Sequence, residues 1–316
     1  MVTKNEIAFI FPGQGSQYVG MGKEFFEEYP IAREIFQEAS DVLGFDMAQL
    51  CFEGPEEKLR LTENTQPALL TVSIAVLKTF LSIKDIQPSL VAGHSLGEYS
   101  ALVAVDSIDF GNAVKIVRLR GRFMEEAVPE GLGAMAAVIG LDEKKVIELC
   151  KKAANGAVLS PANFNSPGQV VISGEAEAVK RAIKIGSELG AKKVIPLKVS
   201  GPFHSSLMAP AAKRLERELK SISFKDPIVP VVTNVEAKPN KDGSRVVSLL
   251  VDQLTSPVKW EQSIRNMIDM GIKIFIEFGP GKVLTGLIKR INKDITLFNV
   301  ERPDDIKKVV EFLDAK

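Results

Sequence analysis

The sequence is poor in the residues that build metal sites and disulfide frameworks. Its 316 residues include only two cysteines, Cys51 and Cys150, and two histidines, His94 and His204. Neither cysteine lies in a Cys-x-x-Cys pair or near a histidine cluster, so we expect no metal site and no disulfide scaffold. This cysteine usage is typical of a protein in a reducing compartment.

The chain also lacks an excess of charge of either sign and a long apolar run at its beginning. Lys+Arg and Asp+Glu both total 40, whereas nucleic-acid binders normally carry a basic excess. The apolar run Ile7–Phe11 is too short for a signal-peptide core or a membrane span. We therefore expect a cytoplasmic protein with neither a nucleic-acid partner nor a membrane partner.

What the sequence does contain is the pattern of a globular α/β protein. Hydrophobic residues make up 45% and charged residues 25% of the chain, as in ordinary soluble domains. Short apolar runs alternate with longer helical patterns in the first part, which predicts a parallel sheet with helices on both faces. The strands expected there are Ile7–Phe11 and Ser89–Gly93, and the helices are Glu24–Leu43, Asn64–Leu81 and Leu96–Val105. Two more strands are expected at Ile228–Thr233 and Ile274–Phe278.

Between Gly133 and Val199 the order of the expected elements is strand, helix, strand, strand, helix, strand. This order is typical of a ferredoxin-like unit, although the same elements could also continue the main sheet. We therefore expect an α/β fold with a large α/β-hydrolase-like catalytic domain (residues 1–130 and 200–316) and a small ferredoxin-like subdomain (residues 131–199).

The segment Gly93-His94-Ser95-Leu96-Gly97 matches the Gly-x-Ser-x-Gly pattern of a nucleophile elbow. In such an elbow a strand turns sharply into a helix, and the serine stands exposed at the helix N-terminus, where backbone amides favour negative charge. The apolar residues before the motif and the helical pattern after it supply this context. The pattern therefore predicts a serine nucleophile at Ser95.

A serine nucleophile needs a general base, and the two histidines are the candidates. His94 adjoins Ser95, and neighbouring side chains in a tight turn point in different directions. His204 lies in a loop ahead of a helix, where active-site residues commonly occur. Elimination therefore selects His204, but no acidic residue stands out as a third member of a triad.

Several segments together resemble the malonyl-CoA:acyl carrier protein transacylase family of bacterial fatty-acid synthesis. They extend over essentially the whole chain, and their order and joint presence are specific. They are FPGQGSQ (Phe11–Gln17), GHSLGEYSAL (Gly93–Leu102), VRLRGRFMEEAV around Arg120, GPFHSSLM (Gly201–Met208), QLTSPVKW (Gln253–Trp260) and FIEFGPGKVLTGL (Phe275–Leu287).

The resemblance implies a role for each matching residue. Ser95 would carry the acyl group, and His204 would act first as base and then as acid. The main-chain carbonyl of Gln253 would orient the histidine in place of a carboxylate. The backbone N–H groups of Gln14 and Leu96 would form the oxyanion hole.

The resemblance also implies how the acyl group is chosen. Arg120 would bind the free carboxylate of a malonyl group through two parallel hydrogen bonds, although without the resemblance an arginine on a helix is more often solvent-exposed. Phe203 would leave no room for an α-methyl group, and Asn163 would line the cleft. The substrate would be malonyl-CoA and the partner acyl carrier protein, with no cofactor besides the coenzyme A thioester, and we expect a monomer.

Two other function classes share part of this pattern. A serine esterase or thioesterase would have the same elbow, but it would need an acidic triad member and a glycine-rich oxyanion loop of the HGGG type, which the sequence lacks. A carrier-binding protein without activity would not need Ser95, His204 and Arg120 together. The acyltransferase hypothesis therefore explains more of the residues.

Overall fold

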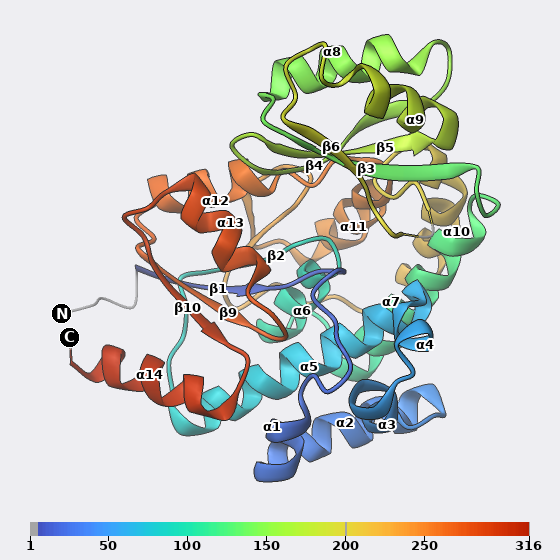
Figure 1. The fold of residues 1–316 in the computed structure, drawn as a ribbon. Helices are drawn as coiled ribbons and strands as arrows, with labels where there is room; N and C mark the ends of the chain where they lie inside the picture. The colour runs from blue at the N-terminus through green and yellow to red at the C-terminus, as the bar shows by residue number, and fades with distance from the viewer. Residues whose placement is uncertain (1–5, 200, 316) are drawn as a thin grey trace.

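The computed structural model describes residues 6–199 and 201–315, and two β-sheets organise this part of the chain (Figure 1). The larger sheet has the strand order β10-β9-β1-β2-β7-β8 and the smaller one the order β4-β5-β3-β6. The strands are β1 (Ile7–Phe11), β2 (Leu90–Gly93), β3 (Gly133–Ile139), β4 (Leu159–Ser166), β5 (Gln169–Glu175), β6 (Lys193–Pro196), β7 (Val231–Val232), β8 (Pro239–Asn240), β9 (Ile274–Phe278) and β10 (Thr296–Val300).

The larger sheet is parallel except at one edge, where β8 runs antiparallel to β7. Its strand β1 is buried on both faces, because Phe9 and Phe11 point into one hydrophobic cluster and Ala8 and Ile10 into another. A strand with two apolar faces is what the continuous run IAFIF requires. The predicted α/β fold is therefore confirmed, but the sheet expected to be parallel is mixed, because β8 is antiparallel at its edge.

Helices cover both faces of this sheet and part of the smaller one (Figure 1). They are α1 (Lys23–Glu28), α2 (Pro30–Leu43), α3 (Met47–Glu53), α4 (Glu56–Arg60), α5 (Thr62–Ile83), α6 (Gly97–Ala104), α7 (Phe110–Glu126), α8 (Glu143–Ala154), α9 (Ala176–Ile185), α10 (Ala209–Leu219), α11 (Val246–Thr255), α12 (Trp260–Asp269), α13 (Val283–Ile291) and α14 (Pro303–Asp314), with short 3₁₀ turns at Ser206–Met208 and Gly243–Arg245.

Helix α5 is long and apolar enough to cross a membrane by length and composition alone. Within the described residues, however, it lies in the main hydrophobic cluster, and 78% of its most apolar stretch is buried. It contributes to the packing with α2, α6 and α7 on one face of the large sheet, whereas α12 and α13 pack on the other face. This burial is typical of a core helix.

The smaller sheet is antiparallel and carries α8 and α9 on the face away from the larger sheet (Figure 1). Its elements occur along the chain in the predicted order of strand, helix, strand, strand, helix, strand. Backbone hydrogen bonds join β4 to the segment before α12, because Phe164 N–H donates to Val258 and Val258 N–H donates to Ala162. The hydrolase-like and ferredoxin-like assignments and the domain boundaries remain predictions.

Two predicted elements are wrong in extent. The single helix expected over Glu24–Leu43 is interrupted at Tyr29, whose extended backbone (φ −121°, ψ 122°) separates α1 from α2. The cause is Pro30, since the residue before a proline is disfavoured in the helical conformation and proline fits the first position of a new helix. The strand expected over Ile228–Thr233 is reduced to the two residues of β7.

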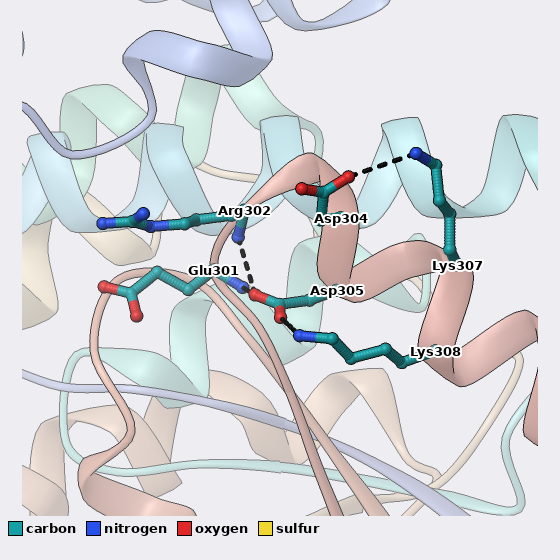
Figure 2. Close-up of polar contacts among 6 residues, drawn as sticks. All are labelled: Glu301, Arg302, Asp304, Asp305, Lys307 and Lys308. Carbon is teal, nitrogen blue, oxygen red and sulfur yellow. Dashed lines mark hydrogen bonds and ion pairs between the residues drawn. The ribbon is translucent and has the colours of Figure 1, made fainter.

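The start of α14 is held by a carboxylate that receives backbone N–H groups (Figure 2). Asp305 accepts from the backbone N–H of Glu301 (3.3 Å) and of Arg302 (3.0 Å), and two lysines one turn further on pair with the acidic residues of this turn. The side chain of Glu301 in turn accepts from the Tyr18 hydroxyl (2.8 Å) and from the backbone N–H of Gly281 (2.9 Å). The C-terminal helix is thereby joined to the loop that follows β1.

Candidate active site

Ser95 lies in a sharp turn between the end of β2 and the start of α6. Its φ of 51° falls in the left-handed region, which costs a non-glycine residue on the order of 1–3 kcal/mol. The flanking glycines permit this turn: a Cβ on Gly93 would lie 1.9 Å from the carbonyl of Gly97, and one on Gly97 would lie 2.1 Å from the oxygen of Phe11. The strand–turn–helix context that the motif predicts is therefore present.

His204 lies directly beside this turn. Its Nε2 is 2.9 Å from Ser95 Oγ, and its Nδ1 is 2.8 Å from the main-chain oxygen of Gln253 in α11. A carbonyl oxygen can only accept a hydrogen bond, so Nδ1 carries the proton and Nε2 is free to accept one from the serine hydroxyl. This is the tautomer that a general base for Ser95 requires.

The environment keeps His204 uncharged at neutral pH. The side chain is only 4% exposed. This burial lowers the pKa of His204 to about 3, and the positive charge of Arg120 contributes in the same direction. A neutral imidazole is the form that accepts a proton. His204 is therefore in the form that can accept a proton at any physiological pH.

His94, the other histidine, points toward a different partner. Its Nε2 donates to Asn165 Oδ1 at 2.8 Å, and its ring packs against Trp260 with the ring centroids 5.6 Å apart. Burial lowers the pKa of His94 as well. The structure thus brings Ser95 together with His204 and holds His94 against β4 of the smaller sheet.

Arg120 is fully inside the protein, although it lies on the amphipathic helix α7. Only 1% of it is exposed, and its guanidinium donates to three neutral oxygens: Gln66 Oε1 (2.8 Å), Gln253 Oε1 (2.9 Å) and Ser95 Oγ (3.1 Å). Within residues 6–199 and 201–315 it has no ion-pair partner, and its Nε has no hydrogen bond. A buried guanidinium without a carboxylate partner is able to bind an anion.

The loop after β1 brings Gln14 to the same place. Gly13 in this loop approaches the carbonyl of His94 so closely that a Cβ would lie 2.3 Å from it. Neither Gln14 nor Leu96 donates its backbone N–H to a carbonyl elsewhere in the described chain. Leu96 is the residue before the first turn of α6. Two N–H groups near Ser95 are therefore available to an oxygen atom of a ligand.

A small cavity of about 100 Å³ is lined by Ser95, His204 and Gln14, and it adjoins a larger one of about 480 Å³. Phe203 and Asn163, both predicted to line the site, form walls of the small cavity together with Met124 and Met135. The larger cavity shares Gln14, His94, Asn163, Leu197 and Val199 with it and extends to Tyr18, Arg60 and Lys198. A narrow pocket at the serine thus leads into a wider cleft between the two sheets.

Sequence reasoning missed several residues that hold this site. They are Gln66, Glu98, Asn165 and Asn234, whose side chains bond Arg120, Gln253, His94 and Ser95 respectively. One signal was available for Glu98, because it is the single charged residue in the apolar helix that follows the motif. Asparagine and glutamine in loops and helices carry no such signal. In the described residues, no three His, Cys, Asp or Glu side chains come together as a metal site requires.

Comparison with known proteins places this chain in an established class. The family model described as the acyl transferase domain matches residues 8–307. The curated malonyl CoA-acyl carrier protein transacylase of Escherichia coli K12 is 50% identical over 306 residues, which cover 97% of this chain and 99% of the relative. The corresponding protein of Bacillus subtilis 168 is 49% identical and covers 98% of each chain.

Solved structures agree with this relationship. An acyl carrier protein S-malonyltransferase from Vibrio cholerae superposes with a TM-score of 0.94 at 47% identity, covering 96% of this chain and 99% of the other. A malonyl-transacylase solved in complex with a type II polyketide acyl carrier protein gives a TM-score of 0.95 at 46% identity, covering 97% and 99%. The chain belongs to the acyl transferase family and, within it, to the malonyl CoA-acyl carrier protein transacylases.

Proposed function

We propose that this protein transfers a malonyl group from coenzyme A to the phosphopantetheine thiol of acyl carrier protein, and so supplies the extender unit of fatty-acid synthesis. The main observation behind the proposal is that two functional groups lie next to one oxygen atom, the hydroxyl oxygen of Ser95. Ser95 Oγ lies within hydrogen-bond distance of both the base nitrogen of His204 and the buried guanidinium of Arg120. A nucleophile, a base and a binding group for a carboxylate are what malonyl transfer through serine requires.

In the first half-reaction, His204 Nε2 takes the proton of the Ser95 hydroxyl while the oxygen attacks the thioester carbonyl of malonyl-CoA. The resulting oxyanion accepts hydrogen bonds from the N–H groups of Gln14 and Leu96, and each such donor contributes a factor of roughly 100–1000 in rate. When the carbon–sulfur bond breaks, the imidazolium of His204 returns its proton to the departing coenzyme A thiolate. Malonyl-serine and free coenzyme A remain.

In the second half-reaction the same groups act in reverse. The thiol of the carrier protein enters the cleft and gives its proton to His204, and the thiolate attacks the malonyl ester. Ser95 leaves with the proton from His204. Reactants and products are both thioesters, so the ping-pong reaction is close to energy-neutral and reversible.

Arg120 is the proposed binding group for the malonyl carboxylate. Its two nitrogens now bonded to neutral oxygens can turn to two carboxylate oxygens at once, in the geometry that guanidinium prefers. Gln66 and Gln253 hold the head group from two sides, which reduces the entropy lost on binding. The buried charge requires an anionic partner, and this supports a dicarboxylic acyl group over an acetyl group.

The walls of the small cavity are the proposed size filter. Phe203 adjoins the base and lines the same small cavity as Met124 and Met135. A cavity of about 100 Å³ has little room for a further methyl group once malonyl is in place. Asn163 lies where the small cavity opens into the larger one, in a position to contact the bound acyl group.

The larger cavity is the proposed path for the pantetheine arms of both thioesters. It starts at the serine pocket, and the cationic side chains of Arg60 and Lys198 lie along it, as would suit phosphate groups and an acidic carrier protein. A relative of the same fold has been solved with its carrier protein, which supports this partner. A monomeric state and a cytoplasmic location remain predictions.

The decisive experiment is to incubate the purified protein with malonyl-CoA alone and to map covalent adducts by peptide mass spectrometry. We expect a malonyl group on the peptide that contains Ser95, no adduct in Ser95→Ala, and loss of the adduct when acyl carrier protein is added. Release of free malonate without a lasting adduct would instead indicate a hydrolase. Absence of any reaction would refute an acyl-enzyme altogether.

A further inference from the structure

A carboxylate that does not touch any reacting group lies at the centre of the site. Glu98 is in the first turn of α6, three residues after Ser95, and is only 2% exposed. Its Oε2 accepts two hydrogen bonds, one from the backbone N–H of Asn234 (3.0 Å) and one from Nε2–H of Gln253 (2.8 Å). One oxygen atom thus holds two residues that come from different parts of the chain.

The first of these residues fixes the turn that carries the serine. The side chain of Asn234 donates to the carbonyl of Gly93 at 2.7 Å and accepts from the backbone N–H of Ser95 at 2.7 Å. It therefore holds the backbone on both sides of His94. Because the φ of Ser95 is in a strained region, this turn needs such external support.

The second residue fixes the base and the guanidinium. The main-chain oxygen of Gln253 accepts from His204, and its side-chain oxygen accepts from Arg120. Its side-chain nitrogen, besides binding Glu98, reaches the carbonyl oxygen of Ser95 at 3.2 Å. The rotamer of Gln253 is therefore determined by Glu98 at one end and by Arg120 at the other.

We propose that Glu98 is a positioning residue for acyl transfer: by accepting from Asn234 and Gln253 at once, it sets the distance and angle between Ser95 Oγ and His204 Nε2. This inference rests on the proposed function. It differs from the role of a triad carboxylate, because Glu98 does not contact the imidazole. Misplacement of reacting groups by 1 Å can cost about 100-fold in rate, so a residue that fixes both partners controls the rate without touching the substrate.

The energetic cost of this carboxylate supports a specific role. Burial raises the pKa of Glu98 to about 7, and only part of that penalty is offset by its hydrogen bonds and by the positive charge of Arg120. An apolar side chain of similar size would avoid the penalty. It would also leave the N–H of Asn234 without its acceptor and would leave the amide nitrogen of Gln253 only its longer bonds, to the carbonyl of Ser95 (3.2 Å) and to Asn234 Oδ1 (3.4 Å).

The test compares three substitutions at this position by single-turnover kinetics. Glu98→Gln keeps a carbonyl oxygen that can accept both hydrogen bonds, Glu98→Asp withdraws the acceptor by one methylene, and Glu98→Leu removes it. Coenzyme A release is followed after rapid mixing with malonyl-CoA at several concentrations. The rate constant at saturation and the half-saturating concentration are then obtained separately.

We expect Glu98→Leu and Glu98→Asp to acylate Ser95 roughly 10–100-fold more slowly at saturation, and Glu98→Gln to stay within about threefold of the unaltered protein. The half-saturating concentration should change little in all three, because Gln66 continues to hold Arg120. If Glu98→Leu does not fold, the contrast between the aspartate and glutamine variants decides the question.

Glu277 in β9 offers a matched control. It is also a buried carboxylate that accepts two hydrogen bonds, in this case from the backbone N–H groups of Leu284 and Thr285, and burial raises its pKa to about 7 as well. Glu277→Gln is expected to change stability but not the acylation rate per folded molecule. Equal rates in Glu98→Leu, Glu98→Asp and unaltered protein, or a glutamine variant as slow as the leucine one, would overturn the proposal. Lack of acylation in the unaltered protein would instead refute the proposed function.

Discussion

Replacing Arg120 by alanine removes the only cation that the structure places at the serine within the described residues. A bound malonyl carboxylate would then lie in a buried pocket without a partner. Hydrogen bonds to charged groups contribute about 1.5–3 kcal/mol each, and guanidinium can form two of them with one carboxylate. The expected loss is therefore about 3–6 kcal/mol of transition-state stabilisation, or roughly a 10²–10⁴-fold fall in kcat/KM for malonyl-CoA.

The assay measures kcat/KM of Arg120→Ala for malonyl-CoA and for acetyl-CoA with acyl carrier protein as acceptor. The acetyl group has no carboxylate, so its rate should be unchanged or higher, and the ratio between the two substrates should collapse. Arg122→Ala is the control, since Arg122 lies on the same helix but is exposed and pairs with Glu126. A variant that lacks Arg120 and still prefers malonyl-CoA as strongly as before would refute the binding role.

Three further predictions concern the elbow, the core and the size filter. Gly97→Ala should lower the urea midpoint of unfolding and abolish acylation, because the new Cβ would lie 2.1 Å from the main-chain oxygen of Phe11. The control is Gly286→Ala in α13, which has open space around it and should be neutral or slightly stabilising. Burial raises the pKa of Glu277 from 4.5 to about 7, so between these pH values the folded state retains a proton that the unfolded chain loses. The free energy of unfolding should therefore decline as the pH rises through this range, and the decline should be smaller in Glu277→Gln. Urea unfolding at several pH values measures both. Phe203→Ala enlarges the small cavity and should reduce discrimination against an α-methyl-branched malonyl thioester, measured as the ratio of the kcat/KM values for malonyl and branched substrates. Unchanged discrimination would argue that another part of the cavity wall excludes the methyl group.

The strands could be predicted where the sequence alone determines burial. The runs at β1 and β9 are buried on both faces, are apolar apart from Glu277 and end at proline or glycine, and their predicted bounds, Ile7–Phe11 and Ile274–Phe278, agree with the structure. Prediction was wrong where local and tertiary signals compete. The helical spacing continues through Tyr29, but Pro30 starts a new helix there. The two-residue strand β7 depends on its neighbours, which no local pattern reveals.

For the site, the sequence predicted the residues that carry distinctive chemistry, but apart from Gln253 it did not predict those that hold them. Ser95 stands in a motif, and His204 could be selected because histidine is scarce in this chain. Asn234 and Gln66 are ordinary amides in a loop and a helix, and their importance arises from contacts with segments far away in the sequence. Such contacts depend on the three-dimensional packing, so a single sequence does not reveal them.

The place of β1 in the large sheet has a consequence for how the protein is made. This strand begins the described chain, yet it is central in the sheet and pairs with β9, which is among the last elements. During synthesis on the ribosome, β1 therefore has one edge and an apolar face uncovered until β9 has emerged. Contacts between such distant segments slow folding and expose nascent chains to aggregation. We expect chaperones to retain the growing chain until β9 emerges, and acylation activity to appear only after that point.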